Sequence, residues 1–181
     1  MVRCIDGLHG FPCQGLPPSR FAAAAVLGPG VSVALADART DCYALSGEAA
    51  IRACTEAIAR DPGDVPSYIS RAFELQAKGD HSRSLADYAR AIAIDPARWD
   101  AYHGRAWAYL KLGRPAEALT DAEAAVRLKP GAAHALDVRG HALEALGRRE
   151  EAIADFRRAL AIEPLLQGSR EALGRLGGAT P

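Results

Sequence analysis

The sequence predicts an all-α solenoid, in which helical hairpins of one repeated type stack along the chain. First, proline recurs at a constant interval, at Pro62, Pro96, Pro130 and Pro164. Second, when the segments between these prolines are aligned, small, aromatic and glycine positions coincide. Third, apolar residues within each segment lie three or four apart, which is the spacing of a helix face and not of a strand. A repeat of about 34 residues forms a helical hairpin that buries its apolar face against its neighbours.

The residue type at each aligned position can be explained by its place in such a hairpin. Small residues allow a second helix to approach closely, and glycine permits the left-handed backbone at which a first helix ends. Asp80 then begins a second helix, and proline ends the unit because it cannot continue a helix. The aligned sets are Ala72/Ala106/Gly140, Leu75/Tyr109/Leu143, Gly79/Gly113/Gly147, Tyr88/Ala122/Phe156 and Ala91/Ala125/Ala159.

This pattern resembles the tetratricopeptide repeat, in its length and in its order of small residue, aromatic or leucine, glycine, alanine, aromatic, alanine and proline. The resemblance covers three units, residues 65–98, 99–132 and 133–166, and it implies a right-handed superhelix. The sequence departs from the family at Ser84, which replaces an alanine, and at Ala122, which replaces an aromatic residue.

A further departure is a repeated arginine. Arg71, Arg105 and Arg139 stand where the family usually has leucine. We expect them at the surface of the repeats, with their aliphatic stems packed along the helix.

Incomplete units are expected at both ends of the array. Residues 167–181 should form a capping helix and a tail, because Leu173 and Leu176 can cover the last hairpin. Residues 37–64 should form a partial repeat, in which the segment 47–60 matches a second helix with Ser46 as its N-cap. Its partner helix is missing or degenerate, so we expect one helix and an irregular arm.

The first 36 residues have the layout of a secretory signal peptide. The segment 21–36 is apolar and uncharged, Arg20 precedes it, and Ala34 and Ala36 have the small-residue spacing of a cleavage site. We expect cleavage after Ala36, with Ala38 as second choice, and a true start near Leu16. The alternatives are an uncleaved apolar anchor or a disordered tail. Export predicts a periplasmic or secreted bacterial protein, whereas a retained N-terminus predicts a cytoplasmic one.

Two cysteines, Cys42 and Cys54, remain after such a cleavage, and an isolated pair in an exported chain predicts a disulfide. Cys54 shares a helix face with Ile51 and Ile58, and Cys42 could fold back onto it. The pair is similar to that of small exported tetratricopeptide proteins of bacteria. The alternative is two reduced, half-buried thiols.

Composition and motifs exclude several classes of function. The 181 residues suit one domain, 49% of them are hydrophobic, and the formal net charge is zero. No basic face for nucleic acid follows from that balance. The sequence has no glycine-rich phosphate loop, nucleophile elbow or HExxH motif, so we expect neither catalysis nor a cofactor.

The resemblance implies a concave groove lined by the first helix of each unit, with an apolar end and an ionisable end. Phe73 and Trp107 hold equivalent positions one repeat apart, so their rings could flank one side chain of a bound peptide. The alternative is that both rings only seal the packing between first helices. The expected lining residues are Ile69, Phe73, Gln76, Asp100, His103, Trp107, Leu110, His134, Asp137, His141 and Glu144.

Two other uses of the groove are disfavoured. A zinc site could be drawn from His103, His134, Asp137 and His141, but two helical turns, about 10 Å, separate the last histidine from His134. We therefore expect no metal and interpret these histidines as a pH-responsive rim.

A clamp for a C-terminal carboxylate, which other family members have, needs lysine, arginine and asparagine in the groove. This chain has Ile69, Phe73, His103, His134 and Val138 there. The sequence thus predicts a non-catalytic scaffold that binds a protein or peptide of another kind. A self-associating structural module and a cytoplasmic adaptor are the alternatives.

Overall fold

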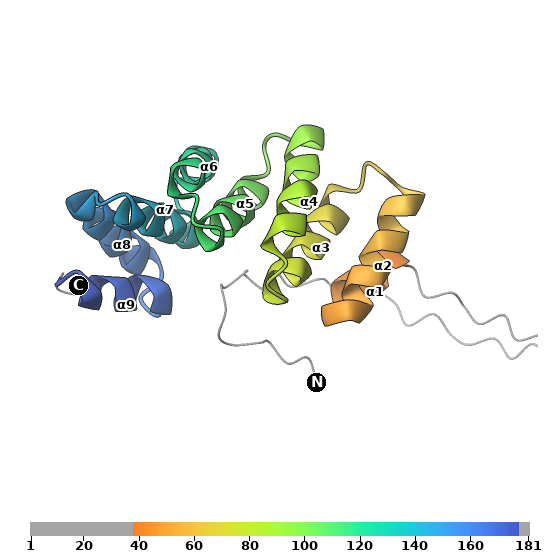
Figure 1. Cartoon of the computed structure of the whole chain (residues 1–181), viewed down its shortest axis with the longest axis horizontal. Helices are drawn as coiled ribbons and strands as arrows, with labels where there is room; N and C mark the ends of the chain where they lie inside the picture. Colours follow the sequence, from red (N-terminus) through yellow and green to blue (C-terminus); the bar gives the residue numbers. More distant parts are fainter. Residues whose placement is uncertain (1–37, 178–181) are drawn as a thin grey trace, which may run out of the picture. The chain divides into compact units, whose positions relative to one another are not determined.

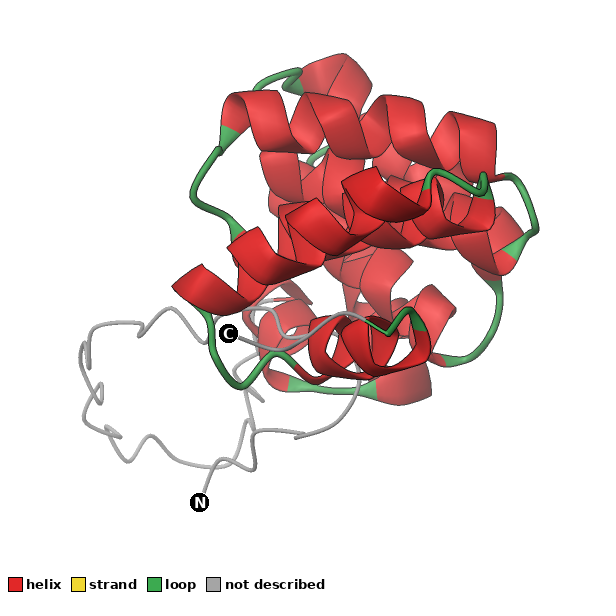
Figure 2. Cartoon of the chain, turned by 90° about the vertical axis from the view of Figure 1, so that its left-hand side faces the viewer, coloured by secondary structure: helices red, strands yellow, loops and turns green. Residues whose placement is uncertain are grey.

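The computed structural model describes residues 38–177, and this part of the chain consists of helices joined by short loops (Figures 1 and 2). The prediction of an all-α repeat solenoid is therefore confirmed. None of the described helices is both long and apolar enough to cross a membrane. The expected signal peptide, with its cleavage site and start, lies outside the described residues. The helices are α1 Ala38–Ala44, α2 Gly47–Arg60, α3 Val65–Ala77, α4 His81–Ile94, α5 Trp99–Lys111, α6 Pro115–Leu128, α7 Ala133–Ala145, α8 Arg149–Ile162 and α9 Gln167–Arg175.

Glycine reverses the chain inside each of the three full hairpins. Gly79, Gly113 and Gly147 have φ angles of 82°, 70° and 77°, in the left-handed region that favours glycine. Beside the first of them, the amide of Asp80 donates to the carbonyl of Leu75 across 2.8 Å. This bond closes the end of α3 as a Schellman motif. Asp80 then caps α4, because its Oδ1 accepts from the amide of Arg83 at 3.1 Å.

Two paired positions of the third hairpin hold a glycine and a large ring. Phe156 of α8 is fully buried against Gly140 of α7, where an added Cβ would lie 2.6 Å from Phe156 Cε1. In the preceding unit the same two positions hold Ala122 and Ala106, both fully buried. A large ring thus faces a glycine in one unit, and alanine faces alanine in the other.

The repeated arginines form a ladder of half-buried ion pairs, with arginine side chains 19–22% exposed, so they lie less at the surface than expected. Each pairs with an aspartate that follows it at a constant offset in the sequence, so that the first helix of a unit is tied to its second. The donor and acceptor atoms are 2.6–2.8 Å apart in every pair. The aspartate side chains are only 4–10% exposed, so the guanidinium groups turn inwards to neutralise them. The pairs are Arg71–Asp87, Arg105–Asp121 and Arg139–Asp155.

The N-terminal unit contains a short partner helix, α1, where a missing or degenerate helix and an irregular arm were predicted. Helix α1 is short, but Ala38 and Cys42 lie one turn apart and are both buried. Cys42 and Cys54 are joined by a disulfide with an S–S distance of 2.08 Å. The bridge fastens α1 onto α2, which explains how a helix of only two turns is retained.

Ser46 occupies the N-cap position of α2, but its side chain makes no capping hydrogen bond. The acceptor comes instead from the next unit. Glu74 Oε2 of α3 accepts from the amide of Gly47 at 2.6 Å. The expected local cap is therefore replaced by a contact between units.

Helix α9 closes the C-terminal end. Ala172 and Leu173 are fully buried, and Leu166 is 9% exposed at its start. These residues join the core cluster that also contains Leu136 and Phe156. Apolar area of the last hairpin is thereby removed from water, as a terminal cap requires.

Candidate functional site

The first helices of successive units form the inner face of the array. Contacts link α1 to α3, α3 to α5, α5 to α7 and α7 to α9. Among the described residues, no such contact joins one second helix (α2, α4, α6 or α8) to another. The first helices therefore lie closer together than the second helices, so the inner face is the concave one.

An aromatic column runs along this inner face. It consists of Phe73, Trp107 and His141, which hold the same position in α3, α5 and α7 and are all half-buried. The rings of Trp107 and His141 meet edge to face with their centroids 5.8 Å apart. On its other side His141 contacts the buried ring of Phe156 at 5.0 Å. Sequence reasoning named all three residues but did not group them as one column, although their recurrence at the interval of the repeat shows it.

Charged groups lie beside Trp107 and His141 of this column. Lys111 Nζ lies 4.7 Å from the centre of the Trp107 ring, which is a cation–π distance. His141 lies between two carboxylates, with Nε2 3.8 Å from Asp137 Oδ2 and Nδ1 3.5 Å from Glu144 Oε2. Glu144 also pairs with Arg175 of α9 at 3.0 Å.

Asp137 is buried beneath the capping helix. Its side chain accepts a hydrogen bond from Ser169 of α9 across 2.6 Å. Burial raises the pKa of Asp137, while His141, the bond from Ser169 and His134 oppose that rise. The Asp137 carboxylate therefore contacts both His141 of the column and Ser169 of the capping helix α9.

Other residues of the expected lining have structural partners. Gln76 donates to the carbonyl of Gly104 at 2.7 Å and accepts from the hydroxyl of Tyr88 at 3.1 Å, so it joins two units. Asp100 is paired with Arg98, with donor–acceptor distances of 3.0 and 2.6 Å. These two side chains are occupied by contacts within the fold.

The apolar members of the expected lining contribute to the core. Ile69 is 7% exposed and belongs to the cluster around Tyr68 and Ala72. Leu110 packs beside Trp107 against a second cluster. Both residues therefore support the floor of the inner face more than its open surface.

The histidines do not assemble into one site. His103 is 7% exposed, with its ring 6.1 Å from Trp99 and 6.2 Å from His134. The Nε2 of His134 lies 3.4 Å from a carboxylate oxygen of Glu163, away from His141. Within residues 38–177, no three histidine, cysteine or acidic side chains are grouped so as to hold a metal ion.

Sequence reasoning missed the partners of the arginine ladder. Asp87, Asp121 and Asp155 also recur at the interval of the repeat, each at the same offset after its arginine. That double recurrence was visible in the sequence and signals a pair within each unit. The bond from Ser169 to Asp137 had no such signal, because it occurs once and joins the cap to the last hairpin.

Comparison with known proteins agrees with this architecture. A sequence profile described as tetratricopeptide repeat matches residues 71–133 and 103–169, which together span more than half of the chain. No curated protein sequence matches.

Solved structures of the same repeat type resemble the chain closely. The first TPR domain of human RPAP3 is 27% identical, with a TM-score of 0.61 over 64% of this chain and 91% of that one. The second TPR domain of human RPAP3, solved with an HSP70 peptide, is 30% identical, with a TM-score of 0.57 over 62% and 93%. MamA from Desulfovibrio magneticus RS-1 is 21% identical and shares the fold, with a TM-score of 0.68 over 77% and 79%. The helix order, the repeat spacing and the matched profile together show that the chain belongs to the tetratricopeptide repeat family.

Proposed function

We propose that the protein is a non-catalytic interaction module that holds a peptide or helix of a partner protein on its inner face. The observation that carries the proposal is the aromatic column of Phe73, Trp107 and His141, one ring from each of three consecutive units. Large rings on a concave surface offer apolar contact area at a low cost in side-chain entropy, which is typical of binding hot spots.

The relatives support peptide binding as the type of activity. The second TPR domain of human RPAP3 was solved with an HSP70 peptide, and the first TPR domain of Spaghetti with an HSP90 peptide. This chain has Ile69, Phe73, His103, His134 and Val138 where a clamp for a C-terminal carboxylate needs basic and amide side chains. The proposed ligand is therefore an internal segment with apolar side chains that contact the rings.

We also propose that the module acts outside the cytoplasm. The apolar segment 21–36 supports export by its composition. The bridge between Cys42 and Cys54 suits an oxidising compartment. Intact mass of the protein from its native host tests this, and a mass that retains residues 1–36 would contradict it and favour a cytoplasmic adaptor.

In-cell crosslinking followed by affinity capture and mass spectrometry tests the proposed binding face. Wild type is compared with the double variant Phe73→Ala/Trp107→Ala. Tyr109→Ala is the matched control, because this half-buried ring also lies on α5 but stacks on Arg114 with a separation of 4.6 Å. We expect a partner that is lost only from the double variant, while circular dichroism shows that all three proteins are folded.

Equal capture by wild type and a folded double variant would show that the column is not the binding surface. Self-association would then be the leading function. Leu165 is 81% exposed and Ile162 is 49% exposed at the C-terminal end of the array, and they offer apolar area for a second copy. Sedimentation that depends on protein concentration would support that outcome.

A further inference from the structure

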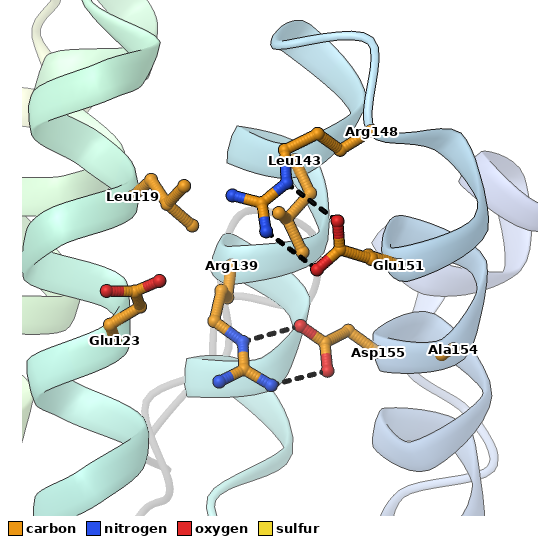
Figure 3. A pocket seen from close by; sticks show the side chains of 8 residues that line it. All are labelled: Leu119, Glu123, Arg139, Leu143, Arg148, Glu151, Ala154 and Asp155. Atoms are coloured by element: carbon orange, nitrogen blue, oxygen red, sulfur yellow. Dashed lines mark hydrogen bonds and ion pairs between the residues drawn. The ribbon is translucent and has the colours of Figure 1, made fainter.

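A second recess lies between α6, α7 and α8, away from the aromatic column. It is a pocket of about 250 Å³, and none of the residues expected to line the inner groove contributes to it. Figure 3 shows Leu119 and Glu123 entering it from α6, opposite Arg139 and Leu143 of α7 and Arg148 in the turn before α8. The pocket thus combines two leucines with a set of charged side chains.

The two arginines of the pocket are already satisfied by their own carboxylates. Arg139 makes two hydrogen bonds to Asp155, at 2.6 and 2.7 Å. Arg148 makes two to Glu151, both at 2.7 Å. Such paired geometry uses the donor edge of each guanidinium and neutralises its charge. An anionic ligand would have to displace one of these carboxylates.

Glu123 is the acidic group of the pocket that has no hydrogen-bonded partner, although it interacts electrostatically with Arg139 and Arg148 over a longer range. Its carboxylate makes no hydrogen bond or ion pair with any residue in the part of the chain that the structure describes. It projects from α6 into the recess beside the two satisfied arginines (Figure 3). The residues that line the pocket carry two cations and three carboxylates, and Glu123 is the carboxylate among them without a hydrogen-bonded cation. Arg158, which does not line the pocket, makes a second ion pair with Asp155 at 3.5 Å.

The corresponding places around the first and second full units carry equal numbers of positive and negative side chains. Position 123, on the helix that precedes the third unit, corresponds to Ala89 on α4, which precedes the second unit, and to Thr55 on α2, which precedes the first. The hydroxyl of Thr55 accepts a hydrogen bond from Arg71 at 3.0 Å and adds no charge. Each of these units has two arginines and two carboxylates in the matching places, namely Arg71, Arg83, Asp80 and Asp87, and Arg105, Arg114, Glu117 and Asp121.

The shape of the third unit also differs from that of the second. Tyr109 lies under the guanidinium of Arg114, with 4.6 Å between the ring centre and Cζ. The corresponding residue of the third unit is Leu143, which is smaller than tyrosine and contributes to the wall of the pocket. Space for an alkyl chain therefore occurs in the same pocket as the carboxylate of Glu123.

We propose that this pocket binds an arginine or lysine side chain of a partner protein. The alkyl stem lies against Leu119 and Leu143, and the cationic head pairs with Glu123. The site goes beyond the proposed inner-face binding, because it uses other residues and recognises charge instead of apolar surface. A partner that contacts both surfaces would be held by two separate anchors.

Nuclear magnetic resonance titration of the full ¹⁵N-labelled chain tests this site. The probe is N-acetyl-arginine methylamide, and the matched neutral probe is the citrulline analogue, which has the same shape without the charge. We expect the arginine probe to shift resonances around the pocket with a dissociation constant on the order of millimolar, as suits one side chain. The citrulline probe should bind about threefold more weakly or worse.

Two substitutions of the exposed Glu123 identify its role without disturbing the core. Glu123→Gln should weaken binding of the arginine probe about threefold, and Glu123→Lys should abolish it, since charge is first removed and then reversed. Glu150→Gln and Glu150→Lys are the matched controls, because Glu150 is also exposed but does not line the pocket. The control variants should bind the probe as wild type does.

Several outcomes would overturn the proposal. Absence of localised shifts with the arginine probe would show that the pocket takes no cationic side chain. Equal binding of the arginine and citrulline probes, or equal loss in the Glu123 and Glu150 series, would show that Glu123 does not select charge. Tighter binding of N-acetyl-glutamate methylamide would assign the pocket to an anion held by Arg139 and Arg148.

Discussion

Ser169 of α9 donates a hydrogen bond to Asp137 of α7 across 2.6 Å, and both side chains are buried. This bond links the capping helix to the same helix that contributes His141 to the aromatic column. His141 lies 3.8 Å from the other oxygen of Asp137. The cap, the buried carboxylate and the end of the proposed binding face are therefore one connected structure.

Loss of the Ser169 hydroxyl should destabilise the cap. Ser169→Ala leaves the buried carboxylate of Asp137 without that donor, and an unsatisfied buried polar group costs about 1–3 kcal/mol. Urea unfolding of the variant should show this loss in the free energy of unfolding. Ser82→Ala, at an exposed position of α4, is the control and should change stability little. Equal stability of Ser169→Ala and wild type would mean that α9 is not held by this bond.

The raised pKa of Asp137 predicts a dependence of stability on pH. Because burial raises this pKa in the folded state, the folded protein binds the proton more readily than the unfolded chain. The contribution of Asp137 to stability is therefore greatest below the ordinary aspartate pKa of about 3.9 and is lost as pH rises through the raised value. Relative to Asp137→Asn, wild type should become less stable between about pH 4 and neutrality. A stability difference that is constant over this range, or that changes in the opposite direction, would contradict the prediction.

The repeated parts of the fold could be predicted from the sequence, whereas contacts that occur once could not. The helix end at Gly147 could be predicted, because a glycine recurs at this position in each full unit. The backbone there is left-handed, which favours glycine. Gln76 was expected in the groove from its repeat position alone, but its amide is used by Gly104 and Tyr88. Repeat position determines which face of a helix a residue lies on. It does not determine whether a neighbouring unit offers a hydrogen-bond partner on that face.

The bridge between Cys42 and Cys54 should stabilise the N-terminal unit. It closes a loop with a sequence separation of 12 residues. In the chain-entropy account a loop of this size contributes about 3 kcal/mol. Dithiothreitol should therefore lower the denaturant midpoint of wild type, and alkylation of the unreduced protein from its host should find no free thiol at these two positions. The control Cys42→Ser/Cys54→Ser should be insensitive to dithiothreitol. Rapid alkylation of the native protein would show two reduced thiols instead.

The arginine ladder should behave as a set of coupled pairs. Arg105→Met leaves the buried carboxylate of Asp121 uncompensated, which should destabilise the protein by roughly 3 kcal/mol. The double substitution Arg105→Met/Asp121→Leu should recover most of this loss, because no buried charge remains. The measurement is a double-mutant cycle of unfolding free energies. Additive losses from the two single substitutions would show that the residues do not act as a pair.

Gly140 of α7 should be hard to replace, because Phe156 occupies the space that a side chain would need. An added Cβ would lie 2.6 Å from Phe156 Cε1, so Gly140→Ala forces the fully buried ring to move and should cost about 1–3 kcal/mol. Gly174→Ala is the matched control on α9, where an added Cβ meets nothing within 4 Å. That change should be neutral or stabilising by up to about 1 kcal/mol, since alanine favours helix more than glycine. Because His141 contacts the same ring, Gly140→Ala should also weaken partner capture, whereas Gly174→Ala should not. If both substitutions proved equally harmless in unfolding experiments, close approach of α7 and α8 would not depend on the missing side chain.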